Sequence, residues 1–264
     1  MLEKLFDKSL LKDNIDYLEF ENQEFLDFLA SKELSRFEKV EQVFFDLAVE
    51  PNLKEVFTSW FYVMPFVLEQ YPFMINIMLE FLEKNFDKTL REDYFNVLIN
   101  IDNKFLDHKI KSRIFNLVFD YYTSHNQWLH SHASKLVYFY DENKHYKKII
   151  NSISGDLDKN KVKIRNAIDI IEEISYHSLL TKSQLEFWKD KFSEYLNLDI
   201  KKYKNLHSAI ISSCAVIMKE DFEWIKSIYF IFENGIEIQH EYSRTCNTIA
   251  PNDEATMAAE ESSE

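Results

Sequence analysis

Apolar residues recur three to four positions apart along most of the chain. The same spacing returns in later segments that begin near residues 90, 110, 164 and 185, and no segment shows the sustained alternation of a strand. A repeat of this length is that of an amphipathic α-helix. The pattern therefore predicts an all-α protein. Its first clear example is the face made by Phe37, Val40, Val43, Phe44, Leu47 and Ala48.

Helix boundaries are marked by capping residues and by chain breakers. Pro51, Gly155 and Gly235 fall where the periodic segments end, as expected for residues that start a new element or close a helix. A capping box joins a Ser or Thr to a Glu or Gln three positions later. Three pairs have this spacing: Ser35 with Glu38, Thr89 with Glu92, and Thr181 with Gln184.

The predicted helices fall into pairs with a regular period. First helices are expected to begin near 36, 72, 109, 145, 183 and 220, and second helices near 52, 90, 127, 160 and 202. The first series repeats about every 36 to 38 residues, a period typical of helical repeats that bury their faces by stacking. In this spacing the chain resembles the HEAT and armadillo class. The resemblance implies a right-handed stack of antiparallel helix pairs; an irregular helical bundle with short loops would give similar spacing and stays an alternative.

The predicted organisation is a single helical domain over residues 1–241. Residues 1–34 would form an N-terminal cap of one or two helices, and 35–234 about five helix pairs. The remainder, 242–264, is small, polar and acidic, and is predicted to be a disordered tail.

Composition narrows the function classes. With only 2 glycines in 264 residues, phosphate-cradling glycine loops and dinucleotide folds are excluded. The two cysteines, Cys214 and Cys246, form no CxxC pair and fit a reducing compartment. The segment 56–79 has one charged residue, Glu69, but its prolines and amides argue against a membrane span. We expect a cytoplasmic protein with no membrane association.

The net charge of −14 is unevenly distributed. Residues 1–108 carry 22 acids and 11 bases, 109–219 carry 12 acids and 18 bases, and 220–264 carry 11 acids and 2 bases. In the basic middle, two clusters open neighbouring second helices, so stacking would place them on one edge. This predicted basic ridge, which could meet phosphates, comprises Lys161, Lys163, Arg165, Lys201, Lys202 and Lys204.

An acidic stripe marks the other end of the predicted stack. Such a surface suits a basic partner and speeds its capture; ordinary solubility is the alternative reading. The stripe comprises Asp13, Asp16, Glu19, Glu21, Glu24 and Asp27.

Candidate catalytic or metal chemistry is sparse. His125, His130 and His132 form the only metal-like cluster, but on one helix His130 would point nearly opposite His132, and no carboxylate has HExxH spacing. If the segment 124–129 is a loop, this objection weakens. No nucleophile motif is present and no cofactor is implied. We therefore predict a protein that is not an enzyme.

Two functions fit these features. The first is a non-enzymatic module whose acidic surface engages a basic protein, such as an immunity protein that neutralises a toxin or nuclease by covering its active site. The alternative is a nucleic-acid or phosphate-binding helical repeat that uses the basic ridge. The sequence fixes neither the partner nor the oligomeric state.

Overall fold

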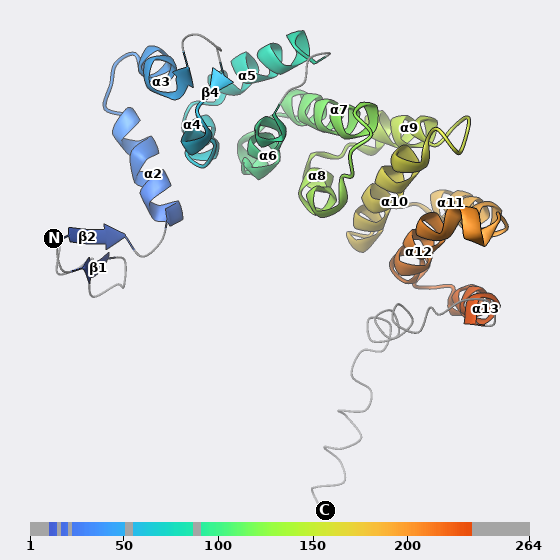
Figure 1. The fold of residues 1–264 in the computed structure, drawn as a ribbon. Coiled ribbons are helices and arrows are strands. Elements are labelled where there is room, and N and C mark those ends of the chain that lie inside the picture. Colours follow the sequence, from blue (N-terminus) through green and yellow to red (C-terminus); the bar gives the residue numbers. More distant parts are fainter. Residues whose placement is uncertain (1–10, 15–16, 21–22, 51–54, 87–90, 234–264) are drawn as a thin grey trace, which may run out of the picture. The chain divides into compact units, whose positions relative to one another are not determined.

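The structure is a computed structural model that describes residues 11–14, 17–20, 23–50, 55–86 and 91–233. Helices dominate these residues, as the apolar periodicity predicts (Figure 1). The contacts divide the chain into two compact units. Unit 1 runs up to Val118 and includes Tyr138–Tyr140, whereas unit 2 holds Phe119–Val137 and the residues from Asp141 onward. The single domain over 1–241 stays a prediction, and its tail, 242–264, lies outside the described residues.

Unit 1 combines short helices with two antiparallel hairpins, β1–β2 and β3–β4. α4 contacts α2, α5 and α6, and its neighbour α6 buries Tyr94, Phe95 and Leu98. The 3₁₀ turns are labelled η. In chain order the elements are β1 (Leu11–Asn14), β2 (Tyr17–Phe20), α2 (Gln23–Leu34), α3 (Val40–Ala48), β3 (Val49–Glu50), β4 (Glu55–Val56), η1 (Thr58–Phe61), α4 (Met64–Gln70), α5 (Pro72–Lys84), α6 (Glu92–Asn100) and η2 (Asn103–Phe105).

The N-terminal cap of one or two helices predicted for residues 1–34 contains one helix among its described residues. Within this segment α2 is helical, but β1 and β2 form a hairpin with Leu11 opposite Phe20. The reason for the strands lies in local composition: Tyr17 and Phe20 favour strands, and Asn14 disfavours a helix interior. Ten residues with these preferences cannot hold a helix against the pairing of two strands.

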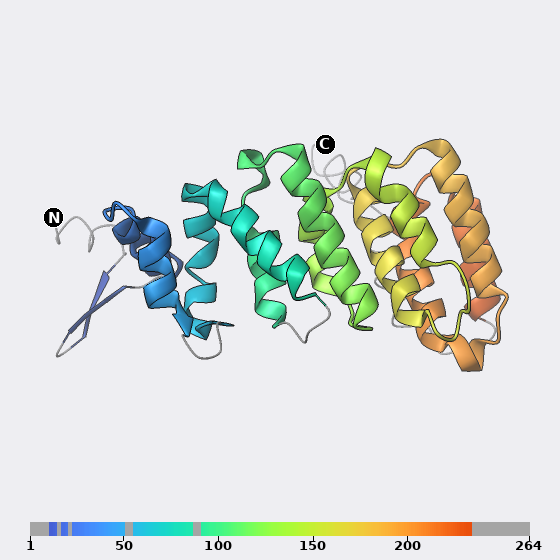
Figure 2. The same cartoon turned by 90° about the horizontal axis from the view of Figure 1, so that it is seen from above.

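Unit 2 is built around α10, which contacts α8, α9 and α12. Its predicted apolar face is buried, because Ile164, Ile168, Ile171 and Ile174 all lie in the core. α12 in turn contacts α10, α11 and α13, and Figure 2 shows these helices packed side by side. The elements are η3 (His130–His132), α8 (Ala133–Leu136), α9 (Glu142–Ser152), α10 (Lys161–Tyr176), α11 (Lys182–Leu196), α12 (Ile200–Ile217) and α13 (Phe222–Glu233). α7 (His108–Ser124) and η4 (Val137–Phe139) each contribute residues to both units.

Most predicted helix starts agree with the structure. Those near 72, 109, 145, 183 and 220 match α5, α7, α9, α11 and α13, and those near 90, 160 and 202 match α6, α10 and α12. The start near 52 is wrong, because 55–61 forms β4 and η1 and the next helix begins at Met64. The starts predicted near 36 and 127 are several residues too early, because α3 begins at Val40 and α8 at Ala133.

One of the three predicted capping boxes is confirmed. Thr181 accepts a hydrogen bond from the backbone of Gln184, whose side chain accepts one in return from Thr181 N. Ser35 instead follows the end of α2 and donates to Lys32 O, so the Ser35–Glu38 box is wrong. In the third pair, Thr89 lies outside the described residues, and α6 begins at Glu92 with Arg91 as its N-cap. Gly155 lies in the loop after α9 with φ of 100°, as expected for a glycine that closes a helix; Pro51 and Gly235 lie outside the described residues.

Candidate anion-binding pocket

The two basic clusters predicted from the sequence meet at one pocket of unit 2. The pocket has a volume of about 420 Å³ and lies where α10 and α12 begin. Among the described residues that line it, none is acidic. Trp128 and Tyr203 supply its aromatic side chains. Its cationic side chains are Lys161, Arg165, Lys201, Lys202 and Lys204.

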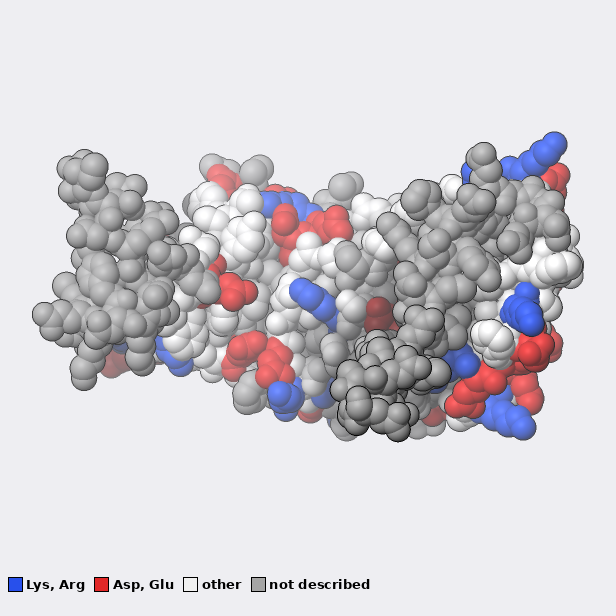
Figure 3. All heavy atoms as spheres, turned by 90° about the horizontal axis from the view of Figure 1, so that it is seen from below, with Lys and Arg blue, Asp and Glu red and all other residues white. Residues whose placement is uncertain are grey.

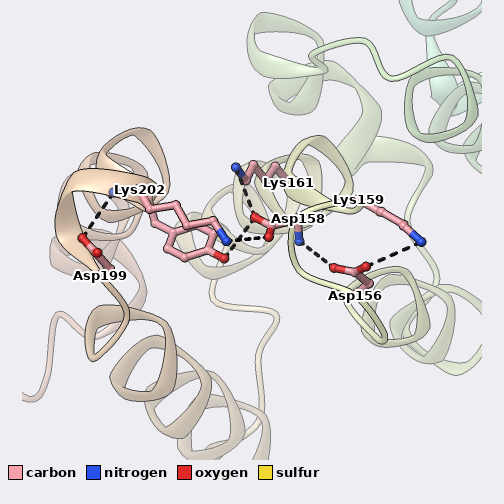
Figure 4. A network of polar contacts seen from close by, with 7 residues as sticks. Asp156, Asp158, Lys159, Lys161, Asp199 and Lys202 are labelled. Atoms are coloured by element: carbon pink, nitrogen blue, oxygen red, sulfur yellow. Dashed lines mark hydrogen bonds and ion pairs between the residues drawn. The ribbon is translucent and has the colours of Figure 1, made fainter.

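An aspartate just outside the pocket holds two of these lysines in place. Lys202 Nζ donates to Asp158 Oδ2 over 2.6 Å, the Tyr203 hydroxyl donates to Oδ1 over 3.0 Å, and Lys161 Nζ lies 3.4 Å from Oδ1 (Figure 4). The hydrogen bond from Lys202 is the main reason why the pKa of Asp158 is lowered, and the same bond raises the pKa of Lys202. Asp158 therefore stays ionised and neutralises part of the charge, whereas Lys201 and Lys204 have no ion-pair partner among the described residues.

The two helix starts at the pocket differ in how they are capped. Asp199 caps α12 and accepts from the backbone N–H of Lys201 and Lys202 over 2.8 and 3.4 Å. Asn160, the N-cap of α10, makes no capping hydrogen bond with its side chain, so this residue leaves the partial positive charge of the helix end uncapped. The lysine clusters and the dipole of α10 thus act in the same direction, which favours an anion.

Trp128 reaches the pocket from the loop after α7, and a buried amide fixes that loop. Asn166, fully buried in α10, accepts from Leu129 N and donates to Gln127 O, both over 2.9 Å. These two hydrogen bonds hold the backbone in place on each side of Trp128. Leu129 is itself buried, yet the Trp128 side chain stays 57% exposed. The loop therefore presents an indole to solvent from a rigid base.

Backbone strain flanks the same tryptophan. Asn126 has φ of 56° and His130 has φ of 29°, values in the left-handed region that few residues other than glycine adopt, Asn and His more often than most. Residues held in such conformations concentrate at functional sites, because the surrounding structure must over-determine them. Here the hydrogen bonds of Asn166 supply that restraint.

Arg165 joins the tryptophan to the interior of unit 2. Its guanidinium lies 5.2 Å from the centre of the Trp128 ring, and Nε lies 2.9 Å from Asp169 Oδ1. Arg165 and Asp169 thus form an ion pair one helical turn apart in α10. Burial raises the pKa of Asp169 against the opposing effect of Arg165. The guanidinium is thereby fixed beneath the indole.

Lys163 is the one member of the predicted ridge that the pocket lacks. Its side chain is half-buried and does not line the cavity. Sequence reasoning missed Trp128, Tyr203, Asp158 and Asn166. Tyr203 stood within the basic run KKYK, which was a usable signal, whereas nothing local marked Asn166 as the residue that fixes a loop 37 positions away.

The structure describes the side chains of only two members of the predicted acidic stripe, Glu24 and Asp27. Asp13 and Glu19 lie in β1 and β2, Glu24 is exposed in the first turn of α2, and Asp16 and Glu21 lie outside the described residues. Asp27 is only 8% exposed and accepts from Gln23 Nε2 over 2.9 Å, so its placement on an exposed stripe is wrong. On the face drawn in Figure 3, the acidic and basic side chains of the described residues are interspersed.

The histidine cluster is occupied with ring contacts. His125 stacks against Tyr121, His132 against Tyr122 and His130 against Trp128. In the described part of the chain, no group of three His, Cys, Asp or Glu side chains is placed to hold a metal ion. Burial raises the pKa of the Cys214 thiol to about 12, which keeps it in the unreactive protonated form.

Comparison with known protein families, curated proteins and solved structures finds no match to this chain. None of the helices that the structure describes is both long and apolar enough to cross a membrane.

Proposed function

We propose that this protein is a binding module for a phosphate-bearing ligand and that the ligand occupies the pocket between α10 and α12. The observation that carries the proposal is the convergence of five cationic side chains on one cavity whose described lining contains no acid. The module acts by binding, without chemistry of its own.

The size and charge of the pocket fit such a ligand. A volume of about 420 Å³ falls within the range of roughly 300–1,000 Å³ that small-molecule sites occupy. Lysine ammonium groups attract phosphate oxygens as point charges, and Arg165 adds a planar fork of donors. Because the whole chain carries −14, it repels polyanions elsewhere, so binding is confined to this site.

The proposed architecture is a stack of helix pairs of the HEAT and armadillo kind. The contacts of α10 with α8 and α12 support it within unit 2, because alternate helices of such a stack lie against one another. This arrangement would bring equivalent helix starts together, as happens at the pocket.

Charge reversal tests the proposal. Lys201→Glu combined with Lys204→Glu alters two exposed lysines of the pocket lining and is expected to weaken binding of a labelled single-stranded oligonucleotide at least tenfold. Lys147→Glu changes an exposed lysine of α9 outside the lining and serves as the matched control. Equal affinity of the double variant and the control would overturn the proposal.

The acid excess supports a second candidate, the inhibitor of a basic protein. Residues 1–108 carry 22 acids and 11 bases, which would steer a basic toxin or nuclease toward this part of the chain. Capture from native lysate at low salt should then yield a basic protein that is inhibited on binding. Recovery of nucleic acid alone would dispose of this candidate and favour the pocket.

A further inference from the structure

We infer that the ligand of this pocket carries a nucleobase beside its phosphates, and that the base stacks on Trp128. The inference rests on the proposed function, since it names the class of phosphate-bearing ligand that the same pocket takes. Its basis is the pairing of a rigid, exposed indole with five cationic side chains in one cavity.

The two aromatic side chains of the pocket differ in what already surrounds them. The ammonium groups of Lys161 and Lys202 lie 5.1 and 5.0 Å from the ring centre of Tyr203, and its hydroxyl is bonded to Asp158. The Tyr203 side chain is therefore already in contact with Lys161, Lys202 and Asp158. Trp128 has Arg165 at 5.2 Å and the tilted ring of His130 at 6.1 Å from its ring centre, yet more than half of its surface is exposed. The indole is thus the surface available for a flat ring, and the phosphates would meet the lysines.

An aromatic side chain that stacks on a ligand selects it best when the surrounding backbone is held in place, as the backbone around Trp128 is. The buried amide of Asn166 holds the backbone before and after Trp128, while Arg165 supports the ring from the side of the protein. Little conformational freedom of the loop remains to be lost on binding, which preserves the stacking energy. A site for phosphate alone would need the lysines but no exposed indole.

Stacking also decides which form of nucleic acid fits. In a duplex the bases are stacked on one another and only their edges face the grooves, whereas single strands and free nucleotides offer their flat faces to aromatic side chains. The chemistry shared by the two candidate sources is a base linked to phosphate through a sugar. We therefore exclude duplexes from the proposed ligand class.

The test compares strands that differ only in their bases. Full-length protein is titrated with a short single-stranded oligonucleotide, with its abasic counterpart of equal phosphate number, with a mononucleotide and with inorganic tripolyphosphate. We expect the base-bearing strand to bind about 10- to 100-fold more tightly than the abasic one, and to quench tryptophan fluorescence.

Three variants test the role of the indole. Trp128→Ala should abolish both the preference for the base-bearing strand and the fluorescence quench, whereas Trp128→Phe should keep part of the preference. Tyr176→Ala changes a residue at the far end of α10 that is 71% exposed, and it should alter neither property.

The outcomes separate the two proposals. Equal binding of both strands, unaltered in Trp128→Ala, would overturn the inference and leave phosphate binding intact. Failure of every probe to bind would overturn the proposed function as well. If the base preference holds, the affinity for the mononucleotide identifies the source of the ligand. A mononucleotide that binds as tightly as the strand points to a free nucleotide. A mononucleotide that binds much more weakly than the strand points to single-stranded nucleic acid.

Discussion

Asn166 shows how one buried amide can organise a site. It satisfies a backbone donor at Leu129 and a backbone acceptor at Gln127, which otherwise would need water or other partners. Between them stands Trp128, held outward although Asn126 and His130 are strained. The chemistry of the pocket thus depends on a residue that does not line it.

Asn166→Ala should lower both stability and binding. The Leu129 N–H loses its partner in a buried position, which costs about 1–3 kcal/mol of unfolding free energy. Release of the loop should also remove the preference for base-bearing strands while phosphate binding persists. Denaturant unfolding and oligonucleotide titration measure the two effects, with Asn143→Ala, an exposed position of α9, as control. A variant that kept the full base preference would show that Asn166 does not position Trp128.

His207 predicts how stability depends on pH. It is buried, its Nε2–H donates to Tyr195 O over 2.9 Å, and burial lowers its pKa below 6.5. Between the folded and the unfolded pKa the unfolded chain binds more protons, so this histidine's contribution to stability falls as pH drops below about 6.5, by at most about 1.4 kcal/mol per unit. His207→Gln should flatten this slope, whereas His177→Gln, which changes an exposed ring, should not. An unchanged slope in His207→Gln would contradict the assignment.

At the scale of elements, local sequence signals predict that a helix forms more reliably than they predict where it begins and ends. The buried face of α10 follows from its isoleucine spacing, and α5 begins at Pro72, where the chain must start a new element. The capping box of α11 is local as well. The β1–β2 hairpin was missed because its strands have only 4 residues each, too few for alternation to be visible.

The cap of α11 gives a direct test of this local control. Thr181→Ala removes the acceptor for Gln184 N and should lower the unfolding free energy by about 0.5–2 kcal/mol. Thr181→Ser keeps a hydroxyl and should retain most of the stability. Both can be measured by urea unfolding. Equal loss in the two variants would mean that the methyl group, not the cap, matters.

Part of the candidate site could be predicted from the sequence. The lysine clusters could be placed together because both open helices of equivalent position, and Lys161 and Lys202 do line one cavity. The position of Trp128 could not be predicted, because it depends on the hydrogen bonds of Asn166 across 37 residues. The burial of Asp27 was hidden for a similar reason, since a charged residue signals exposure in sequence and only packing can override it.

On the scale of the whole molecule, charge is separated along the chain. The chain carries a net charge of −14, yet cationic side chains are in excess at the starts of α10 and α12. Long-range repulsion opposes the approach of any polyanion, and short-range attraction holds it once it is seated. Binding should therefore be selective for one site and strongly sensitive to salt.

The most direct test is the salt dependence of the affinity for a short single-stranded oligonucleotide. If about three to five of the pocket cations each meet a phosphate, log K should fall with log salt with a slope of about −2 to −3.5. The slope should be shallower in the Lys201→Glu, Lys204→Glu variant and unchanged in Lys147→Glu. A flat response in the unmodified protein, or the same slope in all three, would contradict binding at the pocket.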